Sequence, residues 1–135
     1  MSEYKNVERP FLDRLDQLGW TVVESAKSKS YRAPDPRATF RTDLRTVTLR
    51  TLFLEALHKL NPWLTDQQAR SVYDDLIKIE STVPDLIEGN RAIFKILTGQ
   101  TPIRIARNKQ TGETNVAVRL LDFSHPENNS YYAIN

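Results

Sequence analysis

The sequence predicts an α+β fold with a helical middle and a mixed sheet at its C-terminal end. Apolar residues recur at three- and four-residue spacings as far as Leu97, which is the period of amphipathic helices. After Gly99 the period falls to two, which is typical of half-buried strands. At 135 residues, 39% of them hydrophobic, the chain has room for a single domain over residues 1–135, with a modest core.

A short helix is predicted first, with Asn6 as its cap and Gly19 as its C-terminal stop. Its apolar stripe, which we expect to face the core, consists of Val7, Phe11, Leu15 and Leu18. The segment Trp20–Val23 then predicts a brief strand. Between about residues 24 and 42 the chain is rich in Ser, Pro, Arg and Lys, which favours a loop.

Three helices are predicted in the middle of the chain. One runs from about residue 43 to 60 and ends before Asn61-Pro62, because the residue before a proline disfavours helical geometry. The next follows a capping box at 65–68 and ends at Pro84. The last ends at Gly99, and Gly89-Asn90 is placed to interrupt its first turn. Its expected apolar residues are Leu86, Ile93, Phe94 and Leu97.

The C-terminal third predicts strands. Ile103 and Ile105 alternate with polar neighbours, residues 108–112 form a turn, and alternation resumes over 116–120, which indicates a hairpin. A second turn at 125–129 leads to a last strand over 130–135. Since no partner strand follows, we expect this strand to have an unpaired edge and the domain to be truncated.

The net charge of +2 conceals a strongly uneven distribution. From 27 to 50 the local net charge is +5, with only Asp35 and Asp43 opposing the basic side chains, whereas residues 72–90 carry −4. The basic segment is either a phosphate-facing surface or a solvated face, and charge alone does not separate these interpretations. Its basic residues are Lys27, Lys29, Arg32, Arg37, Arg41, Arg45 and Arg50.

Several classes of site are excluded by composition. The absence of cysteine excludes disulfides, thiolate metal sites and a cysteine nucleophile. The four glycines do not form a Gly-rich phosphate loop. No apolar run approaches a membrane span and the first ten residues contain no signal-peptide core, so we expect a soluble, cytoplasmic protein that does not contact a membrane.

Two carboxylates remain as candidates. Glu8 lies at the edge of the first apolar stripe, where a glutamate usually complements the helix dipole or faces solvent. Asp122 follows an apolar strand, and capping of the next turn is the better interpretation there than metal binding. Spacing alone therefore gives no active site.

The order of several short motifs resembles the N-terminal region of the restriction (R) subunit of type I restriction-modification enzymes. The matching stretches span almost the whole chain: Glu8-Arg-Pro-Phe-Leu12, Leu18-Gly-Trp20, Leu57-His-Lys-Leu-Asn-Pro62, Gly89-Asn90, Leu97-Thr-Gly99, Leu120-Leu-Asp-Phe123, Pro126-Glu-Asn-Asn129 and Tyr132-Ala-Ile-Asn135. None of these stretches is specific by itself. Their order and spacing carry the resemblance.

The resemblance implies an incomplete N-terminal part of a PD-(D/E)xK nuclease domain, a fold that cleaves phosphodiesters with Mg²⁺. The family's full subunit also binds ATP, translocates DNA and works with modification and specificity subunits. Its catalytic Asp and E-x-K follow the segment matching Tyr132–Asn135, and the present sequence lacks them. We therefore expect no Mg²⁺ or ATP to be bound by this chain alone.

Two residue assignments follow from the resemblance. Glu8 matches the helix glutamate that such nucleases place near the metal, which makes it the candidate catalytic carboxylate. The proposed DNA-binding residues are the basic side chains Lys27, Lys29, Arg32, Arg37, Arg41 and Arg45. The first hypothesis for function is a piece of the DNA-cleaving R subunit, inactive in isolation. The alternatives are a non-catalytic DNA- or protein-binding module and, with less support, a nuclease completed by dimerisation.

Overall fold

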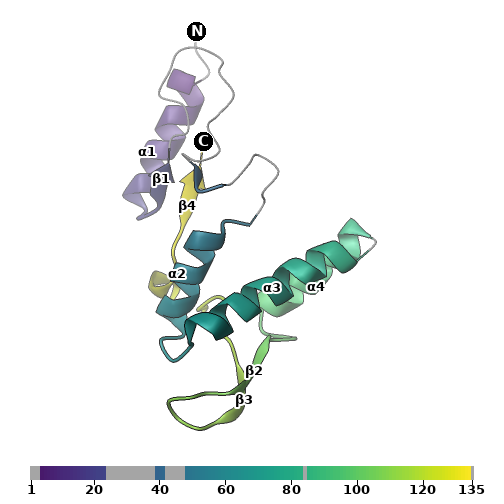
Figure 1. Cartoon of the computed structure of the whole chain (residues 1–135). Coiled ribbons are helices and arrows are strands. Elements are labelled where there is room, and N and C mark those ends of the chain that lie inside the picture. The colour runs from purple at the N-terminus through teal and green to yellow at the C-terminus, as the bar shows by residue number, and fades with distance from the viewer. Residues whose placement is uncertain (1–3, 24–38, 42–47, 84, 135) are drawn as a thin grey trace. The chain divides into compact units, whose positions relative to one another are not determined.

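The computed structural model describes residues 4–23, 39–41, 48–83 and 85–134 (Figure 1). Its elements confirm a mixed α+β chain whose middle is helical. The structure separates into two compact units. Unit 1 comprises residues 1–49 and 130–135, and unit 2 comprises residues 50–129.

Two helical segments follow one another in the described N-terminal part of unit 1. A π-helical turn, η1 (Tyr4–Glu8), leads into α1 (Arg9–Gln17), and Pro10 occupies the first turn, where no intrahelical N–H is needed. At the C-terminal end the amides of Leu18 and Trp20 both donate to the Leu15 carbonyl, at 3.0 and 3.1 Å. Gly19 makes this reversal with φ at +85°, a conformation that side chains disfavour.

The apolar stripe of the first helix was expected to face the core, and the structure corrects this expectation. Val7, Phe11 and Leu18 are 64%, 62% and 62% exposed, whereas Leu12 is buried. The apolar spacing therefore identified the helix correctly but assigned its buried side wrongly. The reason is that periodicity gives an apolar direction, whereas burial depends on which elements pack against the helix.

The final strand has a partner strand within the chain, whereas we expected it to be unpaired. β4 (Tyr132–Ile134) runs parallel to β1 (Thr21–Val23), with Thr21 opposite Tyr132. The Thr21 amide donates to the Tyr131 carbonyl at 2.9 Å, and the Trp20 and Tyr131 rings stack with centroids 5.3 Å apart. The prediction failed because the partner strand lies at the opposite end of the chain, where local patterning cannot identify it.

Unit 2 begins with three helices, α2 (Arg50–Leu60), α3 (Asp66–Thr82) and α4 (Leu86–Leu97), and α3 packs against both of the others. The predicted capping box is confirmed, because Thr65 Oγ1 accepts the Gln68 amide at 3.3 Å and Gln68 Oε1 accepts the Thr65 amide at 3.0 Å. The expected start of the second helix, residues 43–47, lies outside the described residues. Asp85 caps α4 by accepting the Ile87 amide at 2.9 Å.

Helix α4 differs from its prediction in two ways. It passes through Gly89-Asn90 without interruption, because the Gly89 amide keeps its hydrogen bond to the Asp85 carbonyl at 2.9 Å. Of its apolar residues, Leu86 and Phe94 are largely exposed, while Ile96 is buried.

The hairpin of unit 2 forms as predicted. β2 (Arg104–Arg107) pairs antiparallel with β3 (Thr114–Ala117), and a short 3-10 turn, η3 (Pro126–Asn128), follows. The base of the hairpin packs on the core of unit 2. The buried residues of this core are Leu57, Leu64, Ala69, Val72 and Val118. Among the described residues, the hairpin and the β1–β4 pair are separate two-stranded sheets, so the single mixed sheet that we predicted is not found.

Candidate functional site

Glu8 stands at the junction between η1 and α1. Its backbone is already helical, with φ −71° and ψ −49°, and its half-buried side chain caps no backbone amide of α1. The carboxylate lies at the N-terminal end of that helix, where negative charge is favoured by the dipole. In the described part of the chain no three His, Asp or Glu side chains gather closely enough to hold a metal ion. The described residues thus provide no complete Mg²⁺ site around Glu8.

The predicted basic segment lies mostly outside the described residues. This applies to Lys27, Lys29, Arg32, Arg37 and Arg45. Arg41 is described and half-buried, and its Nε is the one buried side-chain nitrogen or oxygen without a hydrogen-bond partner in the described chain. Arg50 has a different role, because its guanidinium lies 5.4 Å from the Tyr73 ring centroid and so packs within unit 2.

Asp122 organises a turn, as predicted. Its Oδ1 accepts the amides of Ser124 and His125 at 3.2 and 3.0 Å. Its Oδ2 accepts the Asn128 side chain at 3.0 Å and the Arg119 guanidinium at 3.3 Å. The hydrogen bond from Asn128, then that from the His125 amide, and the positive charge of Arg119 lower the pKa of Asp122 below its ordinary value of 3.8. The carboxylate is therefore committed to holding residues 119–128 in place.

Sequence reasoning missed a second polar anchor beside this turn. The buried Asn61 donates from Nδ2 to the carbonyls of Leu57 and Arg119, at 2.9 and 2.7 Å. Its Oδ1 accepts the Arg119 amide at 2.9 Å. The only sequence signal was the Asn-Pro pair, which marks the end of a helix but does not identify a distant partner.

A further set of cations, absent from the sequence-based assignment, lies on the hairpin. Arg104, Arg107 and Lys109 are all exposed, and none of them forms an ion pair within the described part of the chain. The signal in the sequence was the three basic residues at 104, 107 and 109, within a predicted strand and its turn. It was overlooked because the longer basic segment dominates the charge distribution.

No helix in the described residues is both long and apolar enough to cross a membrane.

Comparison with known proteins gives the family. The family described as the type I restriction enzyme R protein N terminus matches residues 1–135. The HindI endonuclease subunit of a type I restriction enzyme from Haemophilus influenzae is 32% identical over 136 residues, which cover the whole chain and 12% of that subunit. A Methanocaldococcus jannaschii protein assigned as the MjaIXP endonuclease subunit of a type I restriction enzyme is 25% identical, over 96% of the chain and 11% of its own length.

No solved structure matches the chain, so the resemblance to a PD-(D/E)xK nuclease fold has no structural neighbour to support it. The family match, in contrast, covers every residue. The chain therefore belongs to the family of N-terminal regions of type I restriction enzyme R proteins.

Proposed function

We propose that this chain forms part of the DNA-cleaving R subunit of a type I restriction-modification system. In that setting the subunit hydrolyses phosphodiester bonds of unmodified foreign DNA with Mg²⁺ and couples cleavage to ATP-driven translocation. The observation that carries the proposal is the family match over residues 1–135, supported by 32% identity to the Haemophilus influenzae subunit. Because the chain spans only 12% of that relative, these activities belong to the whole subunit.

Within this chain, Glu8 is the only residue that we propose to lie near Mg²⁺. As the first-helix carboxylate, Glu8 would stand near the metal that activates water, but the described residues do not complete a site around it. We therefore assign no catalytic step to this chain alone. ATP would be bound elsewhere in the full subunit, because these 135 residues contain no Gly-rich phosphate loop.

The proposed partners are duplex DNA and the modification and specificity subunits of the same system. For DNA, the supporting feature in the sequence is the net charge of +5 over residues 27–50. Lys27, Lys29, Arg32, Arg37, Arg41 and Arg45 remain the proposed phosphate contacts of this segment.

A chimaeric subunit tests the proposal directly. The aligned 136-residue segment of the Haemophilus influenzae relative is replaced by this chain and expressed with the remaining subunits of that enzyme. We expect the chimaera to reduce plating of unmodified phage, while the purified 135-residue chain with Mg²⁺ leaves plasmid DNA intact. Cleavage by the chain alone would contradict the assignment of catalysis to the full subunit.

The alternative, a non-catalytic DNA- or protein-binding module, gives a different result in the same assay. The chimaera would accumulate and associate with its partner subunits but would not restrict phage. Quantifying the chimaera in cell extracts separates this outcome from a protein that is simply degraded.

A further inference from the structure

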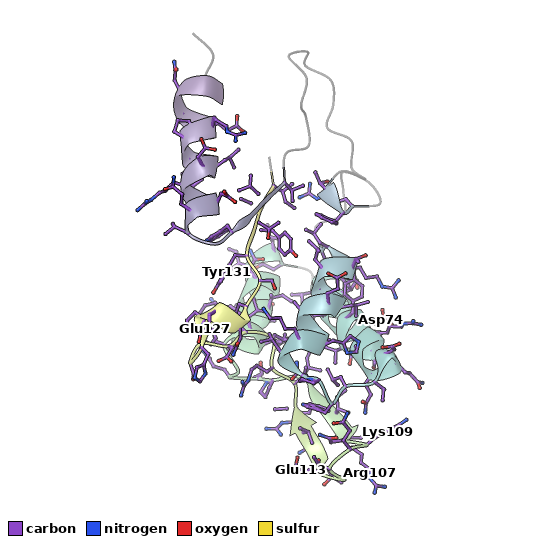
Figure 2. The ribbon with its side chains drawn as sticks, turned by 90° about the vertical axis from the view of Figure 1, so that its left-hand side faces the viewer. Asp74, Arg107, Lys109, Glu113, Glu127 and Tyr131 are labelled. Atoms are coloured by element: carbon purple, nitrogen blue, oxygen red, sulfur yellow. The ribbon has the colours of Figure 1, made fainter. Side chains whose placement is uncertain are left out.

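The β2–β3 hairpin extends beyond the helices of unit 2 as a two-stranded ribbon (Figure 1). Between Arg104 and Ala117 it carries three basic side chains and a single acidic one, Glu113. Figure 2 shows Arg107, Lys109 and Glu113 at its tip, away from Asp74 on α3. With three basic side chains and one acidic side chain, the hairpin has a local net charge of +2.

The strand geometry distributes these charges over both faces of the ribbon. Arg104 and Arg107 are three residues apart on β2, and side chains alternate along a strand, so the two arginines lie on opposite faces. Lys109 adds a charge in the turn between the strands. Ala106, Asn115 and Ala117 share the Arg104 face and are all exposed.

Hydrogen bonds hold the backbone of the ribbon at its turn and at the start of α3. The buried Asn108 donates its amide to the Glu113 carbonyl at 2.8 Å, and its Oδ1 accepts the Gln110 amide at 2.8 Å. Next to the turn, Gln68 Nε2 donates to the Arg107 carbonyl at 3.0 Å, which ties the turn end of β2 to the start of α3. A preorganised surface loses little conformational entropy on binding.

Some cations elsewhere in the described chain are paired within the fold. Arg119 pairs with Asp122 at 3.3 Å and Lys78 with Asp75 at 3.6 Å. On the hairpin, Arg104 donates to the Asn115 carbonyl at 2.8 Å and keeps its full charge, since a carbonyl does not neutralise it. Arg107 and Lys109 form no ion pair with the described residues.

We propose that the β2–β3 ribbon is a contact surface for the phosphate backbone of duplex DNA, with Arg104, Arg107 and Lys109 as the phosphate-contacting residues. A DNA groove admits a two-stranded ribbon, and its two walls are lines of phosphates. Charges on both faces of a ribbon match that geometry. This inference rests on the proposed function, because it names a DNA contact of the same subunit outside the segment 24–42.

The composition of the ribbon favours DNA over an acidic protein. Protein interfaces are centred on aromatic or large aliphatic anchors. The large hydrophobic residues that the described chain exposes all lie outside residues 104–117. Apart from Glu113, the ribbon exposes Arg, Lys, Thr, Asn, Gln, Gly and Ala, a set typical of backbone contacts with nucleic acid.

The test measures binding of the whole 135-residue chain to a labelled duplex oligonucleotide by fluorescence anisotropy over a series of NaCl concentrations. Three double variants are compared with the parent. Arg107→Ala with Lys109→Ala removes two ribbon charges. Lys59→Ala with Arg70→Ala removes two exposed charges from α2 and α3 and serves as the matched control. Arg107→Lys with Lys109→Arg keeps both ribbon charges.

For the ribbon alanine variant we expect affinity at moderate salt to fall roughly tenfold or more, and the slope of log K against log salt to decrease by about 2. The control and the charge-conserving variant should keep the parent slope. Equal affinities and slopes for the ribbon and control variants would overturn the inference. The ribbon would then be assigned to contact with a protein partner. A slope that falls in the charge-conserving variant as well would also contradict a phosphate contact.

Two further measurements keep the test decisive. Thermal unfolding of each variant shows whether the ribbon still forms, and the charge-conserving pair retains the comparison if the alanine pair is less stable. The phage-restriction assay is independent: a chimaera that restricts DNA while its ribbon variant binds DNA like the control removes this inference but leaves the proposed function intact.

Discussion

The side chain of Asn61 satisfies both backbone polar groups of Arg119, a residue 58 positions further along the chain. Nδ2 donates to the Arg119 carbonyl at 2.7 Å, and Oδ1 accepts its amide at 2.9 Å. The C-terminal end of α2 is thereby fastened to the segment that follows β3. Since Arg119 also pairs with Asp122, the two polar anchors share one residue and hold the same turn.

The substitution Asn61→Ala should be strongly destabilising. It leaves the backbone amide and carbonyl of Arg119 without their partner at a site where Asn61 itself is only 2% exposed. Unsatisfied buried polar groups cost about 1–3 kcal/mol each, so we expect the free energy of unfolding to fall by roughly 2–4 kcal/mol. Urea titration followed by circular dichroism measures it, with the exposed Asn90→Ala as the control. A change as small as that of the control would show that water replaces the anchor.

Asp122 makes the stability of unit 2 depend on pH. Because the folded-state pKa is lowered, the ionised carboxylate stabilises the fold above pH 3.8, and that contribution is lost as pH falls through the folded-state pKa. Asp122→Asn lacks this contribution at every pH. We therefore expect the urea midpoints of parent and variant to differ at neutral pH and to converge as pH falls below about 4. A difference that is constant over pH would indicate that geometry, rather than charge, holds the turn.

The predictions that held depend on short sequence separations. The Thr65–Gln68 box, the hairpin turn and the turn cap at Asp122 are each closed by hydrogen bonds between residues at most seven positions apart. Residue type and spacing contain nearly all the information needed for such structures. The resemblance to the family likewise rested on the order of local motifs, and the family match confirms it.

The features that were predicted wrongly or missed depend on distant partners. β4 pairs with β1 at the other end of the chain, and Asn61 contacts Arg119, neither of which local patterns can show. The exposed Phe11 and buried Leu12 illustrate the same limit, because a periodic pattern does not state what covers a helix. For the site, the sequence offered Glu8 from the resemblance, and the roles of Glu8 and of the basic segment stay predictions.

Loss of the α3 cap has a smaller expected effect. Thr65→Ala removes the acceptor of the Gln68 amide and should lower the free energy of unfolding by about 1 kcal/mol. Ser71→Ala, at an exposed position within the same helix, provides the control and should be neutral or slightly stabilising. Chemical denaturation distinguishes the two. Equal midpoints would mean that Gln68 alone supports the first turn.

The basic segment has a test of its own. Replacing Arg37, Arg41 and Arg45 by Ala should weaken binding to duplex DNA and reduce the slope of log K against log salt by about 3 if each contacts a phosphate. Alanine at three exposed cations of unit 2, namely Lys59, Arg70 and Lys95, is the control with the same net charge. An unchanged affinity and slope would remove the segment from the DNA interface. Because Arg41 has a buried Nε, the Arg37 and Arg45 pair is measured separately.

Glu8 is best tested inside the chimaeric subunit, since the described residues do not complete a metal site. Glu8→Gln keeps the size and polarity of the side chain and removes its charge. If the carboxylate stands beside Mg²⁺, cleavage should fall roughly a hundredfold or more while ATP hydrolysis and DNA binding persist. Asp16→Asn, which removes an exposed charge from α1, should leave cleavage unchanged. A chimaera that restricts phage equally well with either substitution would assign Glu8 to the helix dipole, because a dipole complement affects stability and not the rate of cleavage.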